Sequence, residues 1–256
     1  MRALRETLGD FDVRIWQGGG RERPLLYLHE YEQHPGAAPF LAKLGERHAV
    51  RAPEHPGYGR STGFEHVEDV FDVTLHYRRL LERWNAGPVD VIGHGLGGMF
   101  AAELAAIAPQ LVRRLVLVSP YGLWLDDTPM PDPFVLNPAA LAKMKWHDPE
   151  KAGSEPSAFD AADGETIATF RAQNLSTATK FLWPIPDRGL KRRLQYVAAP
   201  TLIVRGVADG LFPAPYVDAW TAAIAGARAA TIADAGHLPM VEAEDAFVAT
   251  VEKFLS

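Results

Sequence analysis

Residues 89–106 read Val-Asp-Val-Ile-Gly-His-Gly-Leu-Gly-Gly-Met-Phe-Ala-Ala-Glu-Leu-Ala-Ala. Their first part, 89–92, is a short apolar run that favours a buried strand, and the small residues from position 96 onward favour a helix over 96–108. The glycines between the two allow a sharp turn. A strand that turns this sharply into a helix lifts the side chain at the apex, position 95, above the edge of a sheet.

The same alternation of short apolar runs and longer helical patterns extends along most of the chain. Strands are predicted at 13–16, 25–28, 49–52, 89–92, 115–118, 202–205 and 229–232. Helices are predicted between them, at 38–47, 67–84, 96–108, 215–224 and 243–255. This order predicts an α/β fold with a mostly parallel central sheet and helices on both faces. The first strand precedes three glycines and is expected at an antiparallel edge.

The alternation stops between Pro120 and about Val197. We therefore predict an α/β core formed by residues 1–120 and 198–256, with a cap inserted at 121–197 over the carboxyl edge of the sheet. A surface excursion without functional contacts is the alternative. Large aromatic side chains in an otherwise polar insertion favour the cap, because they would be costly in water. These residues are Trp124, Phe134, Trp146, Phe159, Phe170 and Trp183.

Composition excludes several classes of function. The chain of 256 residues has a formal net charge of −6, and its longest basic cluster is Lys191-Arg192-Arg193, so nucleic acid is not an expected partner. The absence of cysteine excludes disulfides and thiolate chemistry. Neither a signal-like start nor a long apolar run is present, which predicts a cytoplasmic protein without a membrane partner.

Bound cofactors and metals are also not expected. No G-x-G-x-x-G motif follows the first strand, so the glycines at 18–20 are interpreted as a turn rather than as a dinucleotide site. Five histidines show no metal-ligand spacing backed by nearby carboxylates, and packing or surface roles are expected for them. They are His34, His48, His66, His76 and His147.

The apex of the turn departs from the motif it otherwise matches. In a nucleophile elbow, G-x-S-x-G, the central serine is presented at a helix N-terminus, which stabilises developing negative charge. Here the string is Gly93-His94-Gly95-Leu96-Gly97, so glycine stands where the serine is expected. Position 95 therefore has no side-chain oxygen with which to attack.

Four further motifs accompany the elbow. They are His29 at the end of a strand, Pro56-Gly-Tyr-Gly-Arg-Ser61, Gly206-Val-Ala-Asp209 with Pro213 after it, and Ala235-Gly-His237-Leu-Pro. With these motifs in this order, 114 residues from position 95 to Asp209 and 28 more to His237, the chain resembles the α/β-hydrolase superfamily over nearly its whole length. It looks most like capped bacterial esterases and C–C bond hydrolases.

The resemblance implies acyl transfer with a Ser-His-Asp triad. A serine at position 95, here Gly95, would attack a carbonyl, His237 would take and return the proton, and Asp209 would orient the imidazole. The alternative is that Asp209 only caps a turn and His237 is a structural loop histidine. The resemblance further implies oxyanion donors at the backbone of Leu96 and Tyr31. A small hydrophobic ester or carbonyl substrate is expected beside His29, Glu30, Trp124, Trp146 and Trp183.

Glu30 is a second departure. The family has a His-Gly pair where this chain has His29-Glu30, so a carboxylate replaces the glycine that lets the backbone turn towards the substrate oxygen. A negative charge beside the oxyanion donors would oppose an oxyanion. The other interpretation is that Glu30 points to solvent.

Three hypotheses follow. The first, which we adopt, is a hydrolase of carboxylic esters or related carbonyl substrates that lacks its nucleophile and is strongly impaired. The second is a non-covalent hydrolase or lyase, in which His237 with Asp209, or Glu30, activates a water beside Gly95. The third is a non-catalytic protein that binds a small ligand on a hydrolase fold. Under the first, Gly95→Ser is expected to restore ester turnover unless Glu30 opposes it.

Overall fold

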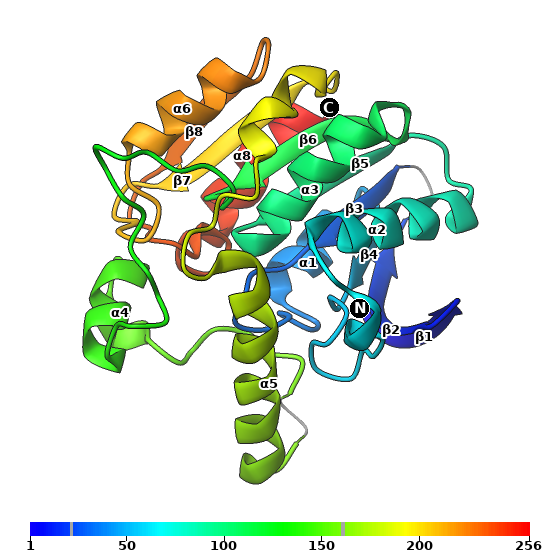
Figure 1. The fold of residues 1–256 in the computed structure, drawn as a ribbon, viewed down its shortest axis with the longest axis horizontal. Helices are drawn as coiled ribbons and strands as arrows, with labels where there is room; N and C mark the ends of the chain where they lie inside the picture. The colour runs from blue at the N-terminus through cyan, green and yellow to red at the C-terminus, as the bar shows by residue number, and fades with distance from the viewer. Residues whose placement is uncertain (21–22, 160–161) are drawn as a thin grey trace.

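The computed structural model describes residues 1–20, 23–159 and 162–256, and within these ranges eight strands form one sheet. The strands are β1 (Arg2–Leu8), β2 (Phe11–Gly19), β3 (Pro24–Leu28), β4 (Ala49–Pro53), β5 (Val89–His94), β6 (Val112–Val118), β7 (Thr201–Gly206) and β8 (Arg228–Ile232). They lie in the order β1-β2-β4-β3-β5-β6-β7-β8 (Figure 1). Strands β3 to β8 are parallel, whereas β2 pairs antiparallel with both β1 and β4.

Helices cover both faces of the sheet, as predicted. They are α1 (Pro39–Leu44), α2 (Val70–Trp84), α3 (Leu96–Ile107), α4 (Pro138–Lys145), α5 (Gly164–Leu182), α6 (Pro215–Ala223), α7 (Pro239–Glu242) and α8 (Glu244–Leu255). Side chains of β6 alternate between two cores. Leu115 and Leu117 pack in the core with α2, α3 and α6, whereas Val116 and Val118 pack in the core with α1 and α8.

The sequence missed one strand, β1. Its residues are mostly exposed or half-buried, and it lies at the edge of the sheet with β2 as its partner. Charged residues such as Arg2, Arg5 and Glu6 are tolerated there because an edge strand buries little of its surface. The apolar-run criterion therefore passes over β1, whereas it finds β8 at the opposite edge of the sheet, where residues 229–232 carry no charge.

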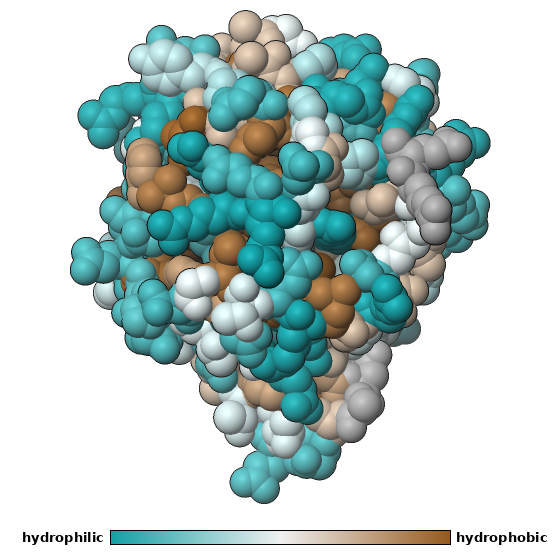
Figure 2. Space-filling view, turned by 90° about the vertical axis from the view of Figure 1, so that its right-hand side faces the viewer, coloured by the Kyte–Doolittle hydropathy of each residue, from teal (hydrophilic) through white to brown (hydrophobic). Residues whose placement is uncertain are grey.

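The segment between β6 and β7 leaves the sheet. It contains α4 and α5, and in Figure 1 α5 projects away from the sheet at the bottom of the view while α4 lies to its left. This segment coincides with the predicted cap, and the division into core and cap stays a prediction. On the face drawn in Figure 2, hydrophobic residues lie in small groups separated by hydrophilic ones. None of the helices in the described ranges combines the length and the apolar character needed to cross a bilayer.

Close backbone packing explains the glycines around the turn between β5 and α3. A Cβ on Gly97 would lie 2.3 Å from the carbonyl oxygen of Leu28, and a Cβ on Gly93 would lie 2.4 Å from that of Gly97. Gly95 itself has φ +52° and ψ −111°. The helix α3 can approach β3 and β5 this closely because glycine has no side chain at the contact positions.

We predict that Gly97→Ala lowers the free energy of unfolding by about 1–3 kcal/mol, because the added methyl group meets backbone that cannot move aside. Urea denaturation measures the change. Gly164→Ala is the matched control, since a Cβ at that first position of α5 meets no atom within 4 Å, and it should change stability by less than about 0.5 kcal/mol. Equal stability of the two variants would contradict the packing argument.

Candidate functional site

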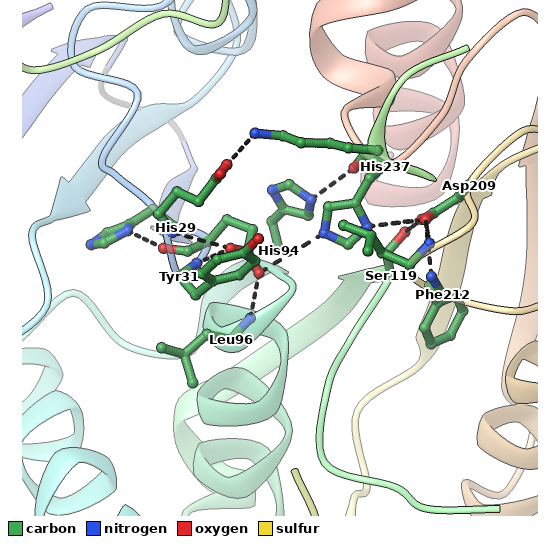
Figure 3. A network of polar contacts seen from close by, with 12 residues as sticks. His29, Tyr31, His94, Leu96, Ser119, Asp209, Phe212 and His237 are labelled. Atoms are coloured by element: carbon green, nitrogen blue, oxygen red, sulfur yellow. Dashed lines mark hydrogen bonds and ion pairs between the residues drawn. The ribbon is translucent and has the colours of Figure 1, made fainter. Parts of the chain in front are cut away.

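The candidate site lies at the carboxyl edge of the sheet. Glu30 follows β3, Gly95 follows β5, Asp209 follows β7 and His237 follows β8. The carboxyl ends of parallel strands meet at one edge of a sheet, which is where ligands bind in open α/β folds. In Figure 3 the ring of His237 lies between Asp209 on one side and Tyr31 and Leu96 on the other. The structure therefore brings together the residues that the sequence assigned to the triad and to the oxyanion donors.

Asp209 and His237 form a buried, oriented pair. His237 Nδ1 lies 3.0 and 3.2 Å from the two carboxylate oxygens of Asp209. Asp209 also accepts hydrogen bonds from the backbone N–H groups of Leu211 (3.0 Å) and Phe212 (2.9 Å) and from the Ser119 hydroxyl (2.6 Å). These donors fix the orientation of the carboxylate towards His237. The pair leaves His237 Nε2 directed away from Asp209.

Glu30 is buried and points into the site. Its Oε1 accepts a hydrogen bond from Leu96 N (3.3 Å), and its Oε2 accepts from Tyr31 N and from Glu32 N (3.2 Å). The two backbone donors that the sequence assigned to an oxyanion thus both bind the Glu30 carboxylate. His237 Nε2 lies 3.9 Å from Glu30 Oε1.

Gly95 and Glu30 share one space. A Cβ added to Gly95 would lie 1.9 Å from Glu30 Oε1 and 2.6 Å from Glu30 Cδ. No side chain at position 95 fits while Glu30 keeps this conformation. The two departures from the family pattern are therefore coupled in space, and a carboxylate oxygen lies where the side chain of residue 95 would begin.

The carboxyl groups of Asp209 and Glu30 and the imidazole of His237 shift one another's pKa values or protonation. Burial lowers the pKa of His237, but the charge and hydrogen bonds of Asp209, followed by the Glu30 carboxyl 3.9 Å from Nε2, outweigh burial and raise it from 6.5 to about 10. Burial raises the pKa of the Glu30 carboxyl, and the facing His237 opposes that rise. Three backbone N–H donors and an imidazolium suit the ionised form of Glu30. At neutral pH, His237 is therefore a cation that lies between the carboxyl groups of Asp209 and Glu30.

Several buried polar atoms near this cluster have no hydrogen-bond partner within the described residues. They are the hydroxyls of Tyr31, Tyr58 and Tyr121 and the Nε2 of His237. The Tyr121 ring lies 6.2 Å from that of Tyr31 and 6.4 Å from that of His237, measured between ring centroids. Buried polar groups are normally paired. These four atoms depart from that rule within the described residues.

His29 was expected to contact substrate, and the structure places it beneath the site. Its Nδ1 bonds the carbonyl oxygen of Glu30 (2.7 Å), its Nε2 accepts from His55 N (2.9 Å), and its ring stacks on that of His55 at 3.6 Å. His29 thereby shapes the backbone that carries Glu30. Within the described ranges, no group of three or more His, Asp or Glu residues could hold a metal ion.

The structure does not gather the three tryptophans of the predicted cap around one pocket. Trp183 is 54% exposed at the end of α5, Trp124 is half-buried against the core on the α3 side, and Trp146 is buried in the other core. Trp146 lines a cavity of about 300 Å³ together with residues of α4 and α5. Their contact with substrate stays a prediction.

The end of α4 holds the two loops that carry Asp209 and His237, a role that no sequence motif signals. Met144 O accepts a hydrogen bond from Gly210 N (2.8 Å), and Lys145 O accepts from His237 N (2.6 Å). Glu242 extends this contact, since its carboxylate accepts from Gly236 N (2.7 Å) and from two backbone groups that follow α4. The predicted cap segment is thus hydrogen-bonded to the loops that position Asp209 and His237.

Comparison with known proteins agrees with this architecture. Residues 19–250 match the alpha/beta hydrolase family. Pimeloyl-(acyl-carrier protein) methyl ester esterase of Xanthomonas oryzae pv. oryzae is 26% identical over 250 residues, which cover 93% of this chain and 96% of the esterase. Lipase 1 of Psychrobacter immobilis is 25% identical over 258 residues, which cover 96% of this chain and 80% of the lipase. The structure of a thermophilic esterase superposes with a TM-score of 0.72 at 22% identity, covering 99% of this chain and 97% of that one, and so shares the fold.

We predict that the His237 ring titrates near pH 10, because two carboxylates favour its charged form. NMR of the ring nitrogens measures the midpoint, which Asp209→Asn and Glu30→Gln should each lower. The folded pKa exceeds the unfolded value, so this group contributes fully to stability below pH 6.5 and its contribution is lost as the pH rises towards 10. Glu46→Gln, at an exposed glutamate, should leave the midpoint unchanged. A wild-type midpoint at or below 6.5 would refute the charge arrangement.

Proposed function

Because the chain belongs to the α/β-hydrolase family, we propose that its site is that of a hydrolase of small carboxylic esters or related carbonyl substrates in which the serine route is closed. Two features support the assignment to ester chemistry. The full-length relatives are named as an esterase and a lipase. The Asp209–His237 pair has the arrangement of an oriented general base, with Nδ1 held and Nε2 facing the site.

The position of Glu30 supports the inference that acyl transfer through a serine at position 95 is blocked. Glu30 Oε1 lies 1.9 Å from the position of a Cβ at residue 95 and accepts the N–H of Leu96. The Glu30 carboxyl therefore occupies the place of a nucleophile side chain at position 95. It also accepts hydrogen bonds from the two backbone N–H groups that an acyl-transfer oxyanion would need. We infer that turnover of carboxylic esters by this chain is strongly impaired.

The alternative with a water beside Gly95 is less well supported. That hypothesis needs an unfilled space at position 95, and Glu30 Oε1 lies in it. His237 is also held as a cation by Asp209 and Glu30, which keep its pKa near 10. A protonated imidazole cannot take a proton from water.

We predict that Gly95→Ser alone restores little ester turnover, because the new Cβ collides with Glu30 Oε1. The double variant Gly95→Ser/Glu30→Gly supplies a hydroxyl, frees the two backbone donors and removes one of the two carboxyl groups that raise the pKa of His237. Its kcat/KM should exceed that of the parent by roughly 10³-fold or more, since the members of such a site act as a unit. Turnover of p-nitrophenyl acetate and butyrate measures the change.

Two controls make the result interpretable. Glu30→Gly alone should stay inactive, because it opens the donors without supplying a nucleophile. His237→Ala in the double variant should abolish the gain. If the parent hydrolyses these esters as fast as the double variant, the proposal that the chain has lost ester turnover by a serine nucleophile is wrong. Full rescue by Gly95→Ser alone would mean that Glu30 moves aside without cost.

A further inference from the structure

We propose that the protein has a second binding site, at the amino edge of the sheet, which takes a small carboxylate with an aromatic or other compact apolar part. The site is formed around Arg51 and Trp84 and shares no residue with the candidate site at the carboxyl edge. Such binding goes beyond the proposed function, because no step of ester hydrolysis is assigned to this edge. It does not depend on the roles of Glu30 and His237.

The site lies in a hollow between the end of α2 and the first residues of three parallel strands (Figure 1). Pro24 begins β3, Ala49 begins β4 and Val89 begins β5, and all three line the hollow, whose volume is about 290 Å³. Strand β5 runs from Val89 to His94, just before Gly95, so its length of about 20 Å separates the hollow from the candidate site. One small ligand cannot occupy both.

The walls of the hollow are mostly apolar. They are formed by side chains of the strands and of the last turn of α2, namely Leu25, Leu26, Leu81, Trp84 and Val89. The four aliphatic residues are at most 3% exposed. The Trp84 ring is held in place by a hydrogen bond from its Nε1 to the Glu6 carboxylate (3.0 Å). A flat apolar group that enters the hollow therefore meets a wall that is already formed.

Arg51 supplies the charge of this site. Its neighbours on β4, Val50 and Ala52, pack in the core with α1 and α8, so Arg51 projects to the opposite face, where its guanidinium carbon lies 4.4 Å from the centroid of the Trp84 ring. Its Nη1 is buried without a hydrogen-bond partner in the described ranges, although buried donors are normally paired. A guanidinium that stacks on an aromatic ring can still bind a carboxylate through the N–H groups in its own plane.

A second, more polar hollow meets the first at Arg51. Its volume is about 480 Å³, and it is lined by Arg2, Gln17 and the glycines at 18–20 as well as by Ala49 and Arg51, which also line the first. Among the described residues that line the two hollows, none is an aspartate or a glutamate. The positive charge at the junction favours an anion. The contrast between the hollows favours a ligand with one charged end and one apolar end.

The size of the apolar hollow selects among anions. A volume of about 290 Å³ lies at the lower limit of small-molecule sites and admits an aromatic ring but not a long acyl chain. An inorganic anion would contact Arg51 and leave the apolar wall in water. Benzoate matches both parts, with its ring against Trp84 and its carboxylate on Arg51, and is the probe that we choose.

Titration of the parent chain with benzoate tests the site directly. NMR follows the indole N–H of Trp84, whose signal is identified by its loss in Trp84→Phe. Benzoate should shift this signal saturably, with a Kd on the order of 1 mM, as expected for a ligand of this size. Benzyl alcohol has the ring without the charge, and acetate has the charge without the ring. Each should bind roughly tenfold more weakly than benzoate, or worse.

Two variants and a matched control assign the binding to this hollow. Arg51→Gln should weaken benzoate binding by roughly tenfold to a hundredfold, because hydrogen bonds from a charged donor are lost. Ala86→Leu fills the hollow from its exposed rim and leaves the charge unchanged, so it should weaken benzoate and benzyl alcohol alike. Arg47→Gln, at an arginine whose side chain is 72% exposed, should bind benzoate like the parent. Thermal unfolding verifies that each variant is folded.

His237→Gln separates this site from the candidate site, because an imidazolium also attracts carboxylates. Benzoate should shift the Trp84 signal of this variant with the affinity of the parent. Absence of a saturable shift in the parent, equal affinity for benzyl alcohol and benzoate, parent-like benzoate binding in Arg51→Gln or in Ala86→Leu, or loss of binding in His237→Gln would each overturn the proposal. If Arg51→Gln does not fold, Ala86→Leu and the three ligands decide. The outcome of the ester assays has no bearing on this test.

Discussion

The carboxylate of Glu30 sets the chemistry of this site because two backbone N–H groups from different loops converge on it. Leu96 N begins α3, and Tyr31 N follows β3, so the carboxylate joins the elbow to the neighbouring strand. Hydrogen bonds to a charged acceptor are about twice as strong as neutral ones. These hydrogen bonds hold the carboxyl group towards His237, whose pKa it raises together with Asp209.

That constraint explains why two unusual residues occur together. Glycine at position 95 keeps the left-handed φ that the elbow requires and leaves room for an oxygen from elsewhere in the chain. Glutamate at position 30 supplies that oxygen and also the charge that balances an imidazolium. Either residue alone would leave a defect: buried donors without an acceptor, or a carboxylate displaced into apolar surroundings.

Much of this architecture could be predicted from the sequence, for identifiable reasons. Buried parallel strands are continuous apolar runs, so β3, β5 and β7 were predicted within one or two residues and β6 within three, whereas the exposed edge strand β1 gave no such signal. The order of the loop motifs placed Asp209 and His237 at one edge of the sheet. The direction of Glu30 could not be predicted, because a side-chain conformation depends on the space left by residue 95, which is distant in sequence.

Contacts made by backbone groups were the hardest to predict from the sequence. Carbonyl groups occur at every position, so the contacts from α4 to the acid and histidine loops leave no trace in residue identity. Tryptophans in the same segment were expected to line a pocket because of their size, yet size alone does not distinguish Trp146, which is buried in a core, from Trp183, which is exposed.

The contact between α4 and the two catalytic loops also limits how far the protein can be treated as separable modules. Met144 and Lys145 supply the acceptors for Gly210 N and His237 N, so excising the inserted segment would remove two hydrogen bonds, each worth about 0.5–1.5 kcal/mol. The inserted segment has clear limits along the chain, but hydrogen bonds join it to the loops at the sheet edge. We therefore expect that a shortened chain that kept Asp209 and His237 would lose the contacts that position their loops.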